Sequence, residues 1–279
     1  ANLDDDNCAE IFFWGRRNGD DWIIAYDCQL NELWRERVIG DPGNYGLADF
    51  NRDGRVELYM RNEIRDAKTG TRIVYGNNWG SVNAGPVAVD IMDDEDLELI
   101  VGGIIYSVNL GNGSDNAGTL TERARIPGYF RRGNNDATSV ADYNLDGYLD
   151  VLAVGSDGGQ NQNTTLFFWD VQNNVVQKFI DPIPNLTLQL SCQNGGPGQY
   201  YQNGWVNGTG RINIADLDGD GQMNASFVSG RYLYALREDF RGQGSVIINE
   251  ETSGYTGCSL FDFKGYGSSE VVYRDEQFV

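Results

Sequence analysis

Residues 138–154 read Thr-Ser-Val-Ala-Asp-Tyr-Asn-Leu-Asp-Gly-Tyr-Leu-Asp-Val-Leu-Ala-Val. Two short apolar runs flank a nine-residue stretch of acidic, amide and glycine residues, Asp142–Asp150. Apolar runs of this length beside turn-forming residues are typical of short β-strands. The stretch therefore predicts a strand, an acidic loop and a second strand.

The nine-residue stretch recurs along the chain with the pattern Asp-x-Asp/Asn-x-Asp-Gly-x-x-Asp/Glu. Its copies begin at residues 2, 49, 90, 142, 216 and 262, which are 47, 41, 52, 74 and 46 residues apart. Strand-like runs flank the copies, and a second hairpin often follows, as at residues 66–75, where Thr69-Gly70 marks the turn. A period of about 40–50 residues with four strands per unit is typical of β-propellers. We expect an all-β propeller of about six four-stranded blades, forming a single domain over residues 1–279.

Composition narrows the possible functions. The 279 residues carry a formal net charge of −20 and include no His. Surplus negative charge argues against nucleic-acid binding and against docking on anionic lipid. The lack of His removes the commonest general base, which favours a non-catalytic protein. No apolar run is long enough for a membrane span, which needs about 18 residues.

The chemistry of the loop points to a hard cation. Positions 1, 3 and 5 offer side-chain oxygens, position 7 a backbone carbonyl and position 9 a carboxylate, while Gly at position 6 permits a sharp bend. Ca²⁺ takes 6–8 oxygen ligands of these kinds. An EF-hand would need a Glu at position 12 before a helix. That position holds residues of β-like runs instead, namely Phe13, Met60, Ala153 and Phe227.

We therefore predict about three to five Ca²⁺ ions, with copies 49, 142 and 216 as the strongest sites. Copy 90 is weaker because Met92 takes a ligand position and Glu95 replaces Gly; copy 262 has Lys264 and Tyr266 where ligands belong, so no metal is expected there. The alternative is that Asp, Asn and Gly only mark turns. The predicted ligands are Asn2, Asp4, Asp6 and Glu10; Asp49, Asn51, Asp53, Arg55 and Glu57; Asp90, Asp94 and Glu98; Asp142, Asn144, Asp146, Tyr148 and Asp150; and Asp216, Asp218, Asp220, Gln222 and Asn224.

These repeats resemble the FG-GAP/VCBS repeats of integrin α-subunit propellers and of many bacterial surface proteins, over nearly the whole chain. Together with the segment from Tyr26 to Trp34, they also look like large secreted proteins of gliding Bacteroidetes. The resemblance implies a seven- or eight-bladed propeller, calcium at the blade loops, and an extracellular or cell-surface role in adhesion or glycan contact. Only the loop positions carry over, because the family has no shared catalytic set.

Four cysteines are consistent with a secreted chain. Cys8 and Cys28 flank one hairpin, and Cys192 and Cys258 remain. An even number favours two disulfides, Cys8–Cys28 and Cys192–Cys258. The alternative is four buried thiols.

Three functions compete on this sequence. The first is a non-catalytic adhesion or scaffold propeller that binds a protein or glycan ligand at the cell surface. The second is a glycan-active enzyme such as a polysaccharide lyase, which would need a channel lined with Arg, Lys and Tyr; the candidates are Arg131, Arg132, Tyr200 and Tyr201. The third is a lectin-like module, in which Tyr200, Tyr201 and Trp205 on a long insertion in the fourth repeat stack on sugar rings.

The first and last repeats are each too short to contain all four expected strands. Residue 2 already lies in a loop, and few residues follow the strand-like run at residues 271–273. We expect an open part of a larger propeller, completed by further domains of the same polypeptide or by a partner chain. The alternative is a closed six-bladed ring, in which residues 11–14 and 271–273 share one four-stranded sheet.

Overall fold

The computed structural model describes ten stretches of the chain, and within them it contains only β-strands, turns and loops. The all-β prediction is therefore confirmed. The chain divides into two compact units, residues 1–124 and 125–279. The described stretches are residues 2–3, 8–38, 45–76, 85–129, 137–156, 164–180, 212–229, 232–237, 244–247 and 259–272.

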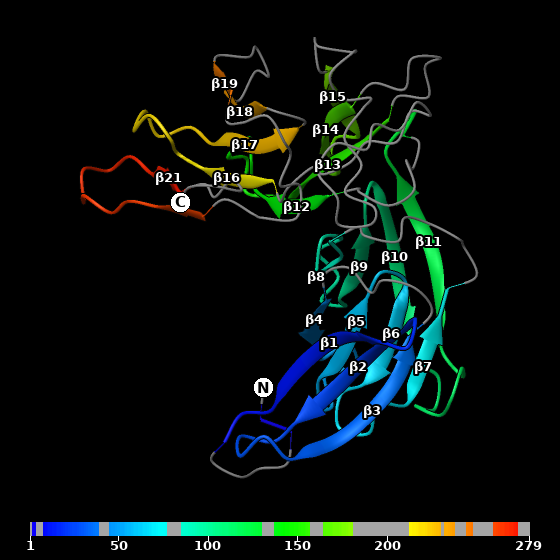
Figure 1. Cartoon of the computed structure of the whole chain (residues 1–279). Coiled ribbons are helices and arrows are strands. Elements are labelled where there is room, and N and C mark those ends of the chain that lie inside the picture. Colours follow the sequence, from blue (N-terminus) through cyan, green and yellow to red (C-terminus); the bar gives the residue numbers. More distant parts are fainter. Residues whose placement is uncertain are drawn as a thin grey trace. The chain divides into compact units, whose positions relative to one another are not determined.

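The first unit holds three antiparallel sheets (Figure 1). One has three strands: β1 (Ile11–Arg17), β2 (Asp20–Tyr26) and β3 (Glu32–Val38). The second has four: β4 (Tyr45–Ala48), β5 (Glu57–Met60), β6 (Glu63–Asp66) and β7 (Arg72–Tyr75). The third also has four: β8 (Val87–Val89), β9 (Glu98–Val101), β10 (Ile104–Asn109) and β11 (Thr119–Arg125), the last ending at the boundary between the units.

The second unit repeats the pattern. Its first sheet contains β12 (Thr138–Ala141), β13 (Asp150–Ser156), β14 (Thr164–Asp170) and β15 (Val175–Ile180). The next contains β16 (Asn213–Ala215), β17 (Asn224–Ser229), β18 (Tyr232–Leu236) and β19 (Gly244–Ile247), and a two-stranded sheet contains β20 (Ser259–Phe261) and β21 (Glu270–Val272). Every four-stranded sheet follows chain order, so each is a meander.

The acidic loops sit where the sequence predicts them. Five of them join the first strand of a sheet to the second, and the loop that begins at residue 2 precedes β1. The four residues at position 12 lie in strands β1, β5, β13 and β17, so the exclusion of an EF-hand is confirmed. Strands β1 and β21 belong to different sheets.

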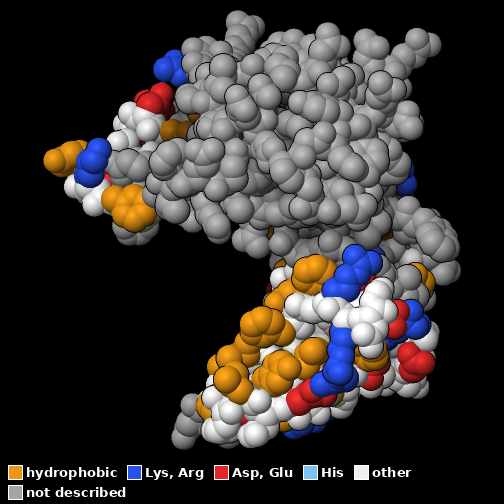
Figure 2. All heavy atoms as spheres, viewed as in Figure 1, with side chains coloured by type: hydrophobic (Ala, Val, Ile, Leu, Met, Phe, Trp, Pro, Cys, Tyr) orange, Lys and Arg blue, Asp and Glu red, His pale blue; other side chains and the backbone are white. Residues whose placement is uncertain are grey.

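Within each unit, neighbouring sheets pack face to face, and the repeat fixes which residues meet. In these interfaces, positions 10 and 12 of a loop, counted into the following strand, face the sheet before, and position 11 faces the sheet after. Thus Leu58 and Met60 of β5 join a buried cluster with Phe12 and Ile23 of the first sheet. On the other face of that first sheet, Phe13 of β1 is 59% exposed. Figure 2 shows hydrophobic side chains on the surface of this unit over β1 and β2.

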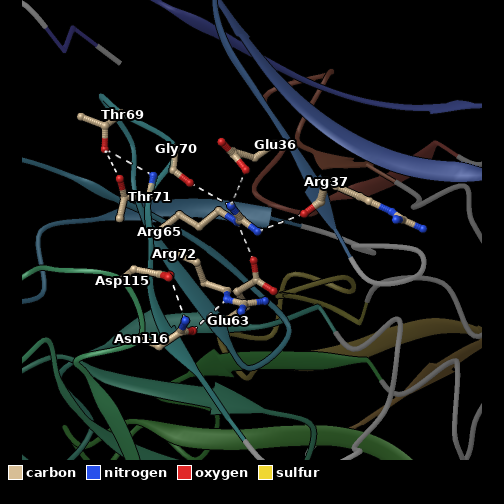
Figure 3. Close-up of polar contacts among 10 residues, drawn as sticks. All are labelled: Glu36, Arg37, Glu63, Arg65, Thr69, Gly70, Thr71, Arg72, Asp115 and Asn116. Atoms are coloured by element: carbon tan, nitrogen blue, oxygen red, sulfur yellow. Dashed lines mark hydrogen bonds and ion pairs between the residues drawn. The ribbon is translucent and has the colours of Figure 1, made fainter.

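A buried arginine ties the first sheet to the second (Figure 3). Arg65 of β6 donates to the carbonyl oxygens of Gly70, at 2.8 Å, and of Arg37 in β3, at 3.3 Å. Its guanidinium also pairs with the buried Glu63 carboxylate. The Trp34 indole of β3 donates to the Ala67 carbonyl at 3.0 Å. A buried charge is tolerated only when it is paired and hydrogen-bonded, and these contacts meet both conditions.

The outer strand of the second sheet is covered by the third sheet's turn. The backbone N–H of Asn116 donates to the Arg72 carbonyl at 2.8 Å, and the backbone N–H of Gly118 donates to the Ile73 carbonyl at 2.9 Å. A Cβ at Gly118 would lie 2.5 Å from a Val74 methyl carbon, so glycine is required for this approach. Part of the β7 edge is therefore already hydrogen-bonded.

Candidate metal centres

Five loops adopt one backbone conformation. Positive φ angles occur at positions 4 and 6 of each loop, where L-residues other than Gly, Asn and Asp are strained. Position 6 is Gly in four loops and Glu95, with φ of 73°, in the fifth. The residues with positive φ at position 4 are Arg52, Asp93, Leu145, Gly219 and Gly265.

The carboxylate at position 1 holds this turn. In loop 142–150, the amides of Asp146 and Gly147 each donate to Asp142 at 2.9 Å. The same bonds recur in loops 49–57, 90–98 and 262–270, where the amides of positions 5 and 6 donate to Asp49, Asp90 and Asp262. In loop 216–224 the donors to Asp216 are Gly219 and Gly221. This carboxylate is thus explained by the turn alone.

The side chain at position 9 is buried and accepts the amide of position 2. Four of these bonds run from a backbone amide to a side-chain oxygen. The Phe50 amide donates to Glu57 at 3.0 Å, that of Ile91 to Glu98 at 3.2 Å, that of Tyr143 to Asp150 at 2.9 Å and that of Leu217 to Asn224 at 2.7 Å. In the first loop, Leu3 donates to Glu10 at 2.5 Å. All five acceptor side chains belong to residues no more than 5% exposed.

Burial raises the pKa of three of these carboxyls, those of Glu57, Glu98 and Asp150. The pKa of Glu57 rises from 4.5 to about 7, mainly through desolvation, and nearby Asp53 and Asp49 raise it further. The pKa of Asp150 rises from 3.8 to about 6 through desolvation, opposed by the amides of Tyr143 and Asn144. Burial also raises the pKa of Glu98. A carboxylate in such a place must take up a proton or find a cation.

Two loops bring three carboxylates together. Oxygen atoms of Asp90, Asp94 and Glu98 lie within 4.8 Å of one another, and so do those of Asp216, Asp218 and Asp220. Either group could hold a metal ion, and a set of carboxylate oxygens suits a hard cation. Loop 90–98 thus gathers its acidic ligands despite Met92 and Glu95, whereas the sequence ranked it below loops 49–57 and 142–150.

Loops 49–57 and 142–150 bring an amide and a carboxylate together at positions 3 and 5. The Asn51 side chain donates to Asp53 at 3.1 Å, and the Asn144 side chain donates to Asp146 at 3.0 Å. The remaining predicted positions are placed only in part. At position 7, a backbone amide donates to the carboxylate at position 5 of the same loop. The donors are Arg55, Tyr148 and Gln222. Asp4 and Asp6 lie outside the described residues, and Asn2 lies within them.

Two arginines form ion pairs with acidic residues of a loop other than their own. The sequence analysis did not predict either pair. Arg52, inside loop 49–57, donates to Glu95 of the next loop at 3.1 Å. Arg237, which follows β18, lies 3.4 Å from Asp218, while its carbonyl accepts the Tyr143 hydroxyl at 3.0 Å. No local pattern marks Arg237, because its approach to Asp218 depends on the sheet.

Loop 262–270 keeps the turn without the ligands. Asp262 still accepts the amides of Tyr266 and Gly267, and these backbone bonds lower its pKa. Tyr266, at ligand position 5, is 81% exposed.

The Cys8–Cys28 disulfide is confirmed, with Cα atoms 5.9 Å apart. Disulfides are typical of proteins in oxidising compartments. The second predicted disulfide, Cys192–Cys258, lies outside the described residues. So do the candidate glycan-contacting residues, namely Arg131, Arg132, Tyr200, Tyr201 and Trp205. Within the described residues, no helix is long and apolar enough to cross a membrane.

Comparison with known proteins finds a structural likeness only. No protein-family profile matches the chain, and no curated protein matches it by sequence. The crystal structure of the V. cholerae biofilm matrix protein Bap1 is similar with a TM-score of 0.59 at 14% identity. The match covers 99% of this chain and 65% of that one, so this chain spans less than two thirds of Bap1. The Tc holotoxin pore of Photorhabdus luminescens matches over 96% of this chain and 13% of its own, at 13% identity and a TM-score of 0.33, too low to support a common fold.

Proposed function

We propose that this chain is a calcium-stabilised, extracellular β-propeller of the FG-GAP/VCBS type that binds a protein or glycan ligand and does not catalyse. The observation that carries the proposal is the repeated loop in which a buried position-9 side chain faces other oxygen ligands. Five sheets carry the turn between strands in the same backbone conformation, and in four of them a buried position-9 side chain accepts the amide of position 2.

The donor set fits Ca²⁺ better than other common ions. The predicted ligands of each site are oxygen atoms, and none of them belongs to a His or a Cys. Asp216, Asp218 and Asp220 would hold the ion in one loop, and Asp90, Asp94 and Glu98 in another. The bound ion would neutralise carboxylates that otherwise repel one another.

An extracellular location is supported by the disulfide, which an oxidising compartment favours. The likeness to Bap1 supports the β-rich fold. It carries no function across at 14% identity.

Calcium titration tests the metal part of the proposal. Isothermal calorimetry on the chelator-treated chain should report several Ca²⁺ ions bound per chain and weaker binding of Mg²⁺, which prefers smaller octahedral sites. Asp218→Asn should remove or weaken one site, while Asp115→Asn, outside the loops, serves as the matched control. Absence of calcium binding by the wild-type chain would refute this part.

A glycan array and a panel of surface proteins test the binding part. A calcium-stabilised adhesion module should retain a ligand in calcium and release it in excess EDTA. Cleavage of an arrayed polysaccharide, detected as new unsaturated or reducing ends, would instead favour the lyase.

A further inference from the structure

Loop 216–224 distributes its acidic side chains differently from two of the other loops. Loops 49–57 and 142–150 have an amide side chain at position 3 and a carboxylate at position 9. Loop 216–224 has the reverse, with Asp218 at position 3 and Asn224 at position 9. Each of these loops has three carboxylates among positions 1, 3, 5 and 9, so the number is kept while one carboxylate has moved.

The moved carboxylate lies at the surface. Glu57 and Asp150, at position 9 of their loops, are buried, whereas Asp218 is exposed. Asn224 is buried and accepts the Leu217 amide at 2.7 Å, so a neutral side chain makes the bond that a carboxylate makes in the other loops. None of the three carboxylates of loop 216–224 is therefore buried.

A guanidinium group faces the moved carboxylate. Nη2 of Arg237 lies 3.4 Å from Oδ2 of Asp218. Oxygen atoms of Asp216, Asp218 and Asp220 lie within 4.8 Å of one another. The arginine thus contacts a member of the group that could hold a cation.

The three-carboxylate group of loop 90–98 gives the comparison. The nearby Arg52 pairs with Glu95 at 3.1 Å, and Glu95 is not a member of that group. Of the ion pairs between described residues, the one that involves a carboxylate of either group is therefore that of Arg237.

The backbone of Arg237 is held in place beside the loop. Its carbonyl accepts the hydroxyl of Tyr143, a residue only 1% exposed. Arg237 directly follows Leu236 of β18, which pairs with Ala225 of β17, the residue next after the loop. The guanidinium is thus presented to Asp218 from a fixed point of the sheet.

We propose that Arg237 competes with calcium for Asp218 and so lowers the calcium affinity of loop 216–224. This inference rests on the proposed calcium binding by the loops. A divalent ion at this loop must approach a fixed positive charge and share or displace the guanidinium at Asp218. The two cations repel each other, and salt screens the repulsion because the groups are exposed. Loop 216–224 therefore fills and empties at a higher calcium concentration than its carboxylates alone would set.

Isothermal calorimetry with calcium, on the chelator-treated chain, tests the proposal. Comparison of the wild type with Asp218→Asn identifies the binding step of loop 216–224. Arg237→Gln should tighten that step roughly fivefold at low salt, and the gain should shrink at about 1 M salt, where the screening length is about 3 Å. Arg237→Lys keeps the charge and should restore most of the difference. Arg123→Gln, which removes an exposed charge from β11, is the control for net charge.

A second background tests whether Arg237 acts through Asp218. Asp218→Asn combined with Asn224→Asp moves the third carboxylate back to position 9, as in loop 142–150, at constant net charge. In this background, Arg237→Gln should change the calcium affinity by less than about twofold, because the two sites no longer interact.

The outcomes separate this inference from the calcium proposal. An unchanged affinity of Arg237→Gln, in a wild-type chain that does bind calcium, would overturn the competition alone. An equal gain in both backgrounds would overturn the role of Asp218. A wild-type chain that binds no calcium would overturn the calcium proposal and this inference together.

Discussion

Loop 142–150 and loop 262–270 have the same turn but different ligands. In both, an aspartate at position 1 accepts the amides of positions 5 and 6, and positions 4 and 6 have positive φ. Loop 142–150 adds Asn144 and Asp146, while loop 262–270 has Lys264 and Tyr266 there. The comparison separates two overlapping patterns. Positions 1 and 6 make the turn, and positions 3, 5 and 9 carry the oxygen-bearing side chains that the proposed calcium site would use.

Removing calcium should have the largest effect on stability. Excess EDTA should lower the melting temperature markedly, because each native-state ion contributes about 2.7 kcal/mol when free calcium is 100 times its Kd. Differential scanning calorimetry at fixed pH and ionic strength measures the change. Magnesium-loaded EDTA with added calcium is the control. An unchanged melting temperature in EDTA would mean that the loops are turns that bind no stabilising calcium.

In EDTA, stability should fall as pH rises from about 4 to about 7. The folded-state pKa values of Glu57 and Asp150 lie near 7 and 6, above their ordinary values of 4.5 and 3.8. The native state therefore holds protons that the unfolded state has released, so unfolding loses them and rising pH favours it. Urea unfolding at several pH values measures this slope.

Asp150→Asn is the matched variant for the pH series. Asn keeps an acceptor for the Tyr143 amide, as Asn224 does for Leu217 in the natural chain. The variant should flatten the pH slope in EDTA and lose stability relative to wild type in calcium. A slope as steep as that of the wild type would show that Asp150 does not contribute to it.

Asp146→Ala should cost more than Lys264→Ala in calcium-saturated buffer. The first change removes the acceptor of two solvent-exposed hydrogen bonds, from Asn144 and Tyr148, worth about 0.5–1.5 kcal/mol each, in addition to a proposed calcium ligand. The second changes an exposed side chain in the loop without ligands, for which about 0.5 kcal/mol or less is expected. Chemical unfolding measures both, and equal small losses would contradict the division between ligand and turn positions.

Gly147→Ala and Gly267→Ala should show the smallest difference. Each glycine has a positive φ, 94° and 84°, and open space where a Cβ would project. Each substitution should therefore cost about 1–2 kcal/mol from backbone strain alone. A much larger loss at Gly147, measured in EDTA, would mean that the two turns are not equivalent.

The strands and loops were predictable because the pattern is local. Tyr45–Ala48, Asp49 and Glu57 appear in the sequence in the order in which the sheet uses them. The burial of Glu57 was not predictable, because a glutamate at the start of a strand is ordinarily exposed, whereas this one is 5% exposed and accepts the Phe50 amide. Glu95 does not prevent loop 90–98 from forming the turn, since the Asp90 carboxylate accepts its amide even with a strained residue at position 6.

Long-range contacts are also absent from the local pattern. Arg237 reaches Asp218 only after β17 and β18 have paired. The sequence of β1 likewise resembles that of other second strands, so only the structure distinguishes exposed Phe13 from buried Met60.

The covered edge of β7 bears on how this protein behaves at high concentration. A free strand edge is a template on which foreign chains can add, and such growth is a route to amyloid. The amides of Asn116 and Gly118 already occupy two carbonyls of β7, so a foreign strand would first have to displace them. Within the described residues the only regular elements are short strands, so this covered edge limits edge-to-edge addition. It depends on a glycine at position 118, where a Cβ would lie 2.5 Å from a Val74 methyl carbon and 2.6 Å from the Asn109 carbonyl oxygen.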